Sequence, residues 1–192
     1  MKLSLLLVLT LALVPMSACT TSRGGPYEPA QGAQRDTNKA EQLTREAAEF
    51  IDEDAERAEA LLVEALGADL FYGPAHNNLG VVYLKRSKLY EAANEFEWAR
   101  KLMPGNPDPR MNLALTLEEA GRFSEAFDAY QATLEVAPEH IATMEALASL
   151  TLRQDVESEA LPDLLKTIAL RGETEEWRHW ARQRLLAFEV SN

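Results

Sequence analysis

Apolar side chains between residues 39 and 190 follow a helical spacing, so that each segment of about a dozen residues carries one apolar stripe. Ala, Leu, Glu and Arg dominate these segments, and Gly, Pro or clustered acidic residues separate them. Such interruptions are typical of turns between helices. The pattern therefore predicts an all-α chain built from short helices.

One set of residues occurs twice along the chain, with a period of 34 residues. Residues 73–106 align with residues 107–140, and a fixed period of this length is typical of stacked helical units rather than of one irregular core. The recurring positions are Leu79 with Leu113, Gly80 with Ala114, Tyr83 with Leu117, Leu89 with Phe123, Ala92 with Ala126, Phe96 with Tyr130, and Pro104 with Pro138.

The residue types at these positions suit two helices that pack closely. Gly80 and Ala92 are small, which allows helix axes to approach within about 8–10 Å. Phe96 is large enough to fill the space between one helix pair and the next. Pro104 has no N–H with which to continue a helix, so it is predicted to end its unit. Gly121 suits a tight turn between two helices.

The segment AHNNLGVVYLKRSKLYEAANEFEWARKLMP resembles the tetratricopeptide repeat, in which two antiparallel helices occupy each 34 residues. His76 stands where that family usually has an aromatic residue, and in the next copy Thr133 replaces the last alanine. The resemblance implies a tetratricopeptide-like α-solenoid. The positions that carry it are Leu79, Gly80, Tyr83, Ala92, Phe96, Ala99 and Pro104.

Weaker copies flank this pair, at residues 39–72 and, in degenerate form, at residues 141–172. The first copy fits if its turn lies near Asp52. Pro162 falls inside the expected second helix of the last copy, so we expect that helix to begin there. Residues 173–190 are predicted to form a capping helix with Trp177 and Trp180 on its apolar stripe. The domain would thus span residues 39–190, with about three to four repeats and a C-terminal cap.

The N-terminus has a pattern of its own. Lys2 precedes the apolar residues 3–14, a span too short to cross roughly 30 Å of hydrocarbon as a helix, so residues 1–18 are predicted to be a signal peptide. The following Met-Ser-Ala-Cys resembles the lipobox of bacterial lipoproteins, although Met16 stands where Leu is usual. That resemblance implies that Cys19, the single cysteine of the chain, carries a lipid.

A lipid on Cys19 would place the protein on the outer membrane, facing the periplasm. Plain secretion into the periplasm and an uncleaved anchor remain alternatives. Residues 19–38 are rich in Gly, Pro, Gln and Ser and show no apolar stripe, so we expect the lipidated cysteine to be followed by a flexible tether.

The charge is strongly acidic, with 19 Lys and Arg against 31 Asp and Glu, and it excludes nucleic acid as an expected partner. His76, His140 and His179 lie in different repeats, and the chain has no phosphate loop or nucleophile elbow. The acidic residues near 52–56 lack the alternating ligands and central glycine of a calcium loop. No catalytic residue, metal site or cofactor is predicted.

In tetratricopeptide proteins the first helices of successive repeats line a concave groove for an extended peptide or a partner helix. The resemblance implies that the groove of this chain includes Asn77, Asn78, Val81, Leu84, Lys85, Met111, Asn112, Leu115, Glu118, Glu119, Glu145, Ser149, Leu152 and Arg153. Asn78 and Asn112 share one repeat position, and an amide that both donates and accepts can hold a peptide backbone. That the two asparagines bridge neighbouring helices is an equally open interpretation.

These features favour a non-enzymatic adaptor or scaffold, similar in plan to lipoproteins that assist secretin or pilus assembly. Its partner would be a peptide or helix of another cell-envelope protein. A scaffold that recruits peptidoglycan enzymes and a tetratricopeptide module that forms a homodimer are the alternatives. A basic clamp for a chaperone tail is not evident, because Lys85 stands nearly alone beside Glu118 and Glu119.

Overall fold

The computed structural model describes residues 35–191, and within this range the chain forms nine α-helices and no strand. The prediction of an all-α chain is confirmed. The helices are α1 (Thr37–Phe50), α2 (Ala55–Ala68), α3 (Gly73–Lys85), α4 (Leu89–Leu102), α5 (Asp108–Glu119), α6 (Phe123–Val136), α7 (Ile141–Arg153), α8 (Leu161–Arg171) and α9 (Glu175–Ser191). The predicted signal peptide, Cys19 and most of the predicted tether lie outside the described residues.

Local sequence explains where several helices begin. The Asp36 side chain accepts a hydrogen bond from the backbone N–H of Lys39 at the start of α1, and Asp54 does the same for Arg57 at the start of α2. These bonds satisfy N–H groups that have no partner inside the helix. Helices α3, α5 and α8 instead carry proline in the first turn, where its missing N–H costs nothing.

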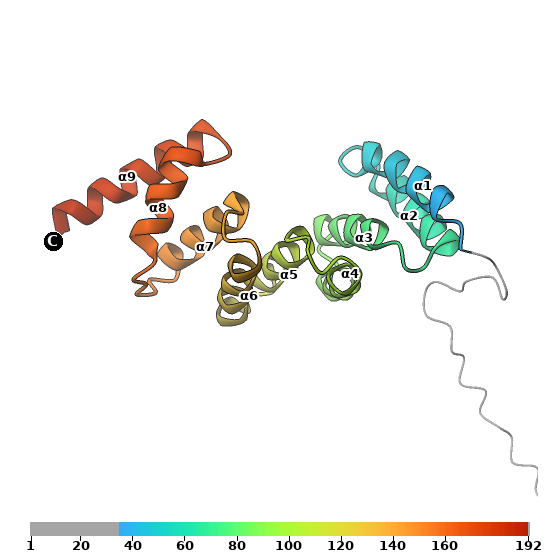
Figure 1. The fold of residues 1–192 in the computed structure, drawn as a ribbon, viewed down its shortest axis with the longest axis horizontal. Coiled ribbons are helices and arrows are strands. Elements are labelled where there is room, and N and C mark those ends of the chain that lie inside the picture. Colours follow the sequence, from blue (N-terminus) through green and yellow to red (C-terminus); the bar gives the residue numbers. More distant parts are fainter. Residues whose placement is uncertain (1–34, 192) are drawn as a thin grey trace, which may run out of the picture.

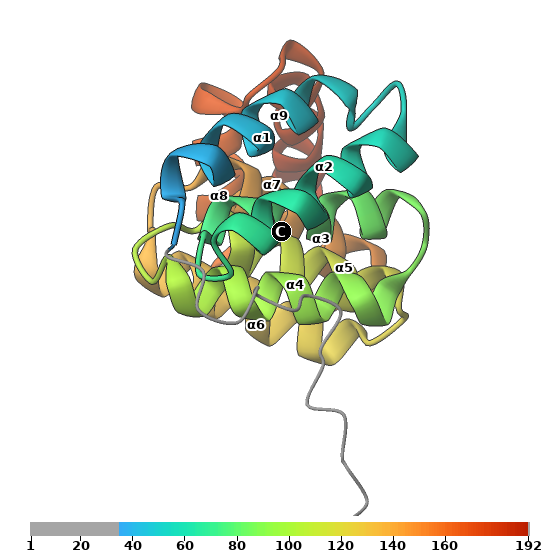
Figure 2. The same cartoon turned by 90° about the vertical axis from the view of Figure 1, so that its right-hand side faces the viewer.

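Each helix packs mainly against its neighbours along the chain, so that α1 to α8 stack as four antiparallel pairs. Figure 2, a view along the molecule, shows the pairs lying behind one another, with α1 and α2 nearest the viewer. The stack curves. In Figure 1 the first pair and the last helices rise on the same side of the central helices, with α4 and α6 on the outer side of the curve.

Small residues lie where the helices of a pair cross. Gly80 of α3 and Ala92 of α4 are buried, as are Ala114 of α5 and Ala126 of α6. A Cβ added at Gly80 would lie 2.6 Å from the Phe96 ring, which has no exposed surface. The close approach predicted from the sequence is therefore present, and it positions the inner surfaces of α3 and α5.

The turns between the two helices of a repeat share one backbone feature. Ser87, Gly121 and Asp155 are spaced by the repeat length, and they have φ values of 56°, 74° and 51°. All three lie in the left-handed region, which is strained for residues other than glycine. The chain thus keeps the same turn geometry in three successive repeats although only one of them has the residue that suits it.

Both ends of the domain are closed by specific contacts. At the C-terminal end, α9 packs on α8 through Trp177 and Trp180, whose rings meet edge to face at 5.1 Å. At the N-terminal end, the buried side chain of Asp69 accepts hydrogen bonds from Arg35 and Thr37. Arg35 and Thr37 thus make contacts with the domain although both precede its predicted start at residue 39.

Candidate peptide-binding groove

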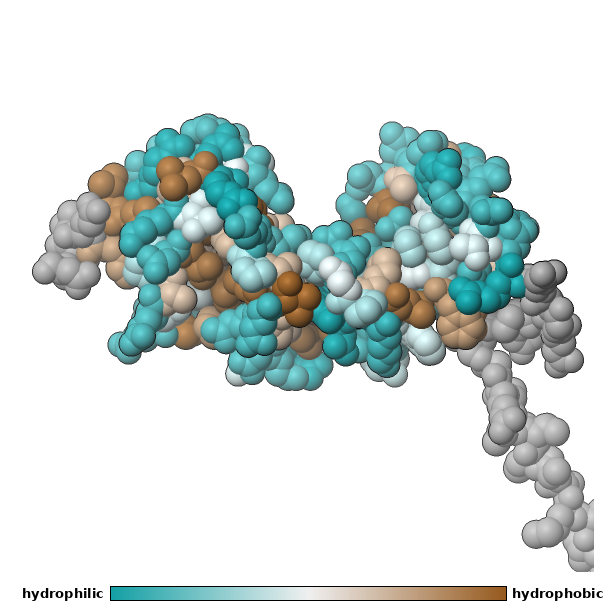
Figure 3. All heavy atoms as spheres, in the orientation of Figure 1, coloured by the Kyte–Doolittle hydropathy of each residue, from teal (hydrophilic) through white to brown (hydrophobic). Residues whose placement is uncertain are grey.

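A hollow opens between the two ends of the curved molecule, above the central helices (Figure 3). Helices α3 and α5 contact each other at its floor, and they carry most of the predicted groove residues. The crossing at Gly80 packs α3 against α4, and α4 in turn packs against α5, so that α4 holds both helices in place.

The structure joins the three predicted asparagines in one chain of side-chain amides. The Asn112 Nδ2 atom donates to Asn77 Oδ1 at 3.2 Å, from α5 to α3. Asn77 Nδ2 makes a longer contact of 3.4 Å with Asn78 Oδ1. All three side chains are half-buried. Among the described residues, Asn78 Nδ2 and Asn112 Oδ1 make no further hydrogen bond, so each end of this chain retains polar capacity.

The other predicted groove residues lie in two environments. Val81, Met111 and Leu115 are half-buried, and Met111 packs against the cluster around Ala114. Apolar atoms therefore remain accessible beside the amides. Lys85 and Glu119 are exposed, and Lys85 Nζ lies 2.5 Å from Asp52 Oδ1 at the turn between α1 and α2.

Two predicted acidic groove residues are occupied by contacts within the domain. Glu118 on α5 accepts from the Tyr130 hydroxyl of α6 at 3.0 Å and from Arg153 of α7. Burial, and then the charge of Glu118, raise the pKa of Tyr130. The prediction that Glu145 faces the groove is wrong. It is 3% exposed and accepts the backbone N–H of Glu173, and burial raises the pKa of its carboxyl group.

A polar cluster around His76 was not predicted from the sequence. Its Nδ1 lies 2.7 Å from Glu95 Oε2 and its Nε2 2.9 Å from the Leu70 carbonyl oxygen, so both ring nitrogens face acceptors. The ring stacks on Trp98 at 5.9 Å. The absence of the usual aromatic residue at position 76 was the available signal, because a buried polar ring there needs partners.

The described part of the chain contains neither a metal site nor a membrane-spanning helix. No group of three or more His, Cys, Asp or Glu side chains there has the arrangement of a metal site. No helix within residues 35–191 has both the length and the apolar character needed to cross a membrane.

Solved structures of tetratricopeptide domains are similar to this chain. The first tetratricopeptide domain of Spaghetti (RPAP3), bound to an HSP90 peptide, is 17% identical, with a TM-score of 0.60 over 65% of this chain and 99% of that one. A crystal structure of MamA is 20% identical, with a TM-score of 0.61 over 69% of this chain and 80% of that one. The fold is a tetratricopeptide-repeat solenoid.

A third structure, MamA from Desulfovibrio magneticus, matches this tetratricopeptide fold with a TM-score of 0.61 at 20% identity, over 72% of this chain and 78% of its own. No family model matches the sequence, and a search of curated proteins finds no match. The likeness thus concerns the tetratricopeptide fold itself, a fold used for contacts between proteins, and it indicates no enzyme family.

Proposed function

We propose that the protein is a non-enzymatic adaptor of the bacterial cell envelope that holds a peptide or helix of another envelope protein in its concave hollow. The observation that carries this proposal is the amide chain of Asn77, Asn78 and Asn112 across the boundary between α3 and α5. A peptide backbone presents alternating donors and acceptors. Asn78 Nδ2 could donate to one of its carbonyl groups, and Asn112 Oδ1 could accept from one of its N–H groups.

The neighbouring surface suits the same occupant. Val81, Met111 and Leu115 place half-buried apolar atoms beside the amides, so a segment with apolar side chains would gain from burial there. The Spaghetti (RPAP3) domain, which has this fold, binds an HSP90 peptide. Our protein would differ in its ligand, because the two cations at predicted groove positions are already paired, Lys85 with Asp52 and Arg153 with Glu118.

Location in the envelope rests on the sequence. The Met-Ser-Ala-Cys motif would place a lipid on Cys19, and the predicted tether that follows would link it to the domain. A Cys19→Ser variant is expected to move from the membrane fraction to the soluble fraction of cells. Equal membrane retention of the variant would contradict the lipid anchor.

The groove is tested by affinity capture from detergent-solubilised membranes. We compare the wild type with an Asn78→Ala, Asn112→Ala double variant, and with Asn94→Ala, which removes an exposed amide from α4, as the matched control. We expect one envelope protein to be captured by wild type and by Asn94→Ala but not by the double variant. Circular dichroism must show equal helix content and similar melting.

Retention of the same partner by a folded double variant would assign the asparagines to helix bridging. If the captured species is another copy of this chain, lost in the double variant, the groove is a dimer interface instead. Secretion or pilus components among the partners would support the narrower role, whereas wall hydrolases would support a peptidoglycan scaffold.

A further inference from the structure

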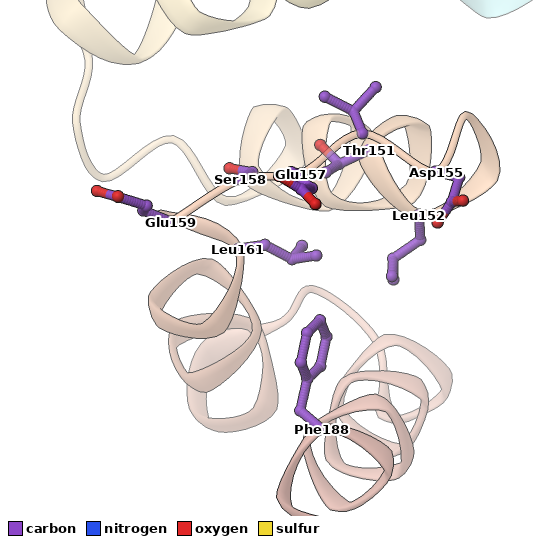
Figure 4. A pocket seen from close by; sticks show the side chains of 9 residues that line it. Thr151, Leu152, Asp155, Glu157, Ser158, Glu159, Leu161 and Phe188 are labelled. Atoms are coloured by element: carbon purple, nitrogen blue, oxygen red, sulfur yellow. The ribbon is translucent and has the colours of Figure 1, made fainter. Parts of the chain in front are cut away.

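Two apolar pockets lie on either side of Val156, in the loop between α7 and α8. The first has a volume of about 380 Å³, and Leu152, Leu161 and Phe188 point toward one another across it (Figure 4). The second has a volume of about 330 Å³ and includes Phe123. Val156 lines both pockets, and we call these lining residues together the Val156 surface. Leu152 is the one predicted groove residue that lines either pocket, and the three asparagines line neither.

The size and exposure of these pockets point to side-chain anchors rather than to a small-molecule ligand. Both volumes are at the low end of the roughly 300–1,000 Å³ typical of ligand sites. Phe123 is 40% and Val156 42% exposed, so apolar surface faces water at the junction of the two pockets. Covering such surface with an apolar side chain is favourable, and two pockets can hold two such side chains.

All charged residues that line the first pocket are acidic. Asp155, Glu157 and Glu159 border it, all three are exposed, and none forms an ion pair within residues 35–191. Figure 4 shows Asp155 and Glu159 at opposite ends of the opening. Many other carboxylates of the domain do pair with Lys or Arg, for example Asp52 with Lys85 and Glu59 with Arg86.

We propose that the Val156 surface docks a basic segment of a partner protein, in which two large apolar side chains are flanked by Lys or Arg. The apolar side chains would enter the two pockets, and the flanking cations would lie beside Asp155, Glu157 and Glu159. An acidic segment would be repelled by the same carboxylates. One molecule could then hold one chain in the hollow and a second at this edge, which is independent of the proposed groove.

Two of the three arginines of α9 are already paired within the molecule. Arg178 and Arg182 both pair with Glu175 of their own helix, and Arg178 also donates to the Gly172 carbonyl oxygen. Their charge is therefore already used within the molecule. Arg184, which lies over the Trp180 ring, is the one arginine of α9 that forms no ion pair within residues 35–191. A partner segment with several unpaired cations therefore matches the three carboxylates better than α9 of a second copy does.

The test is fluorescence anisotropy with the full-length chain purified in detergent. The ligand is a labelled peptide with two leucines flanked by lysines, and its counterpart carries glutamates in place of the lysines. We expect binding of the lysine peptide alone, weakened by salt because exposed charges are screened. An Asp155→Asn, Glu157→Gln, Glu159→Gln variant should bind about tenfold more weakly, since each exposed pair contributes modestly.

The matched control neutralises three exposed acids elsewhere, as Glu49→Gln, Glu53→Gln and Glu91→Gln. It should bind like wild type, as should the Asn78→Ala, Asn112→Ala variant. A Val156→Lys variant, which places a cation between the two pockets, should abolish binding with unchanged helix content.

Several results would overturn the proposal. Equal binding of the glutamate peptide would exclude a charge-selective surface. An equal loss of affinity in the control variant would show that binding depends on the net charge of the protein and not on these three carboxylates. Concentration-dependent dimerisation that Val156→Lys removes, with no binding of the lysine peptide, would assign the surface to a second copy of the chain.

Discussion

Gly80 and Phe96 determine how closely α3 and α4 pack. The Phe96 ring occupies the space that a side chain at position 80 would need, and a Cβ there would approach three of its ring atoms within 3.0 Å. Because Phe96 is fully buried, its ring can move only if other core residues move with it. Position 80 is thus fixed by packing, although glycine is a poor helix former.

A Gly80→Ala variant should therefore lose stability. We expect its free energy of unfolding to fall by about 1–3 kcal/mol, because overpacking outweighs the gain in helix propensity of about 1 kcal/mol. Gly67→Ala is the matched control, since a Cβ at this position of α2 would meet nothing within 4 Å. The free energy of unfolding of Gly67→Ala, measured by urea denaturation, should rise by up to about 1 kcal/mol. A stabilised Gly80→Ala variant would show that Phe96 moves freely.

Asp69 ties the start of the domain to the end of α2. Its carboxylate is 1% exposed and accepts from Arg35 Nε at 2.8 Å, from Thr37 Oγ1 at 2.8 Å and from the Phe71 N–H at 3.0 Å. Burial alone would raise the pKa of Asp69, but these hydrogen bonds together hold it below its ordinary value.

A lowered pKa of Asp69 means that the folded state favours the ionised form. This contribution to stability is present above the unfolded pKa of about 3.9 and is lost as the pH falls through the lower folded value. Asp69→Asn should lower the free energy of unfolding by about 1–3 kcal/mol at pH 7. In acid its stability should change less than that of wild type. Urea titrations from pH 7 to acid, with the exposed Asp52→Asn as control, measure the difference.

At the scale of elements, the turn within each repeat controls how one helix leads into the next. Ser87, Gly121 and Asp155 all adopt positive φ, and all three are exposed. A non-glycine residue in this region carries strain of roughly 1–2 kcal/mol. Each turn must therefore have a residue at this position that tolerates a positive φ angle.

Exchanging residues at these turns should change stability in opposite directions. Gly121→Ala is expected to lower the free energy of unfolding by about 1 kcal/mol, and the cause is conformational because a Cβ there would meet nothing within 4 Å. Ser87→Gly should raise it by about 0.5–1 kcal/mol through relief of the same strain. Thermal melts of the two variants are compared with wild type, and equal shifts of one sign would exclude this explanation.

The helices could be predicted from sequence more fully than the site. Small and large residues such as Gly80 and Phe96 recur at a fixed period. This recurrence predicts the fold, because each copy of the pattern packs its two helices in the same way. The role of Glu145 could not be predicted. It depends on the backbone N–H of Glu173, which a longer α7–α8 loop and the helix break at Gly172 bring to it. Likewise, the repeat period pairs Asn112 with Asn78, whereas the hydrogen bond between the helices joins Asn112 to Asn77.

At the scale of the whole molecule, stability is a sum over neighbouring pairs. Helix contacts run mainly between elements adjacent along the chain, and the two ends of the curve lie apart across the hollow (Figures 1 and 3). In such a solenoid each pair depends on the next one for coverage of its apolar face. The last pair depends on α9, which covers the fully buried Leu165 and Ile168.

A chain that ends at Arg171 should lose stability locally rather than uniformly. Removing α9 takes away several large apolar contacts of roughly 1.5–3 kcal/mol each, so we expect a loss on the order of 5 kcal/mol or more near the C-terminal end. Hydrogen exchange should become faster in α7 and α8, while α1 to α4 keep most of their protection. Equal acceleration in all helices would instead indicate a single cooperative unit.

The shared turn geometry of Ser87, Gly121 and Asp155 also bears on how such a gene could grow. A tandem duplication of the segment encoding residues 73–106 would insert one more helix pair with the same entry and exit as its neighbours, since the backbone returns to the same conformation after each period. The inserted unit would need no new partner surface beyond those already present at its borders. Descendants of one ancestral gene could therefore differ in the length and curvature of the hollow while leaving both terminal closures, at Asp69 and at α9, as they are.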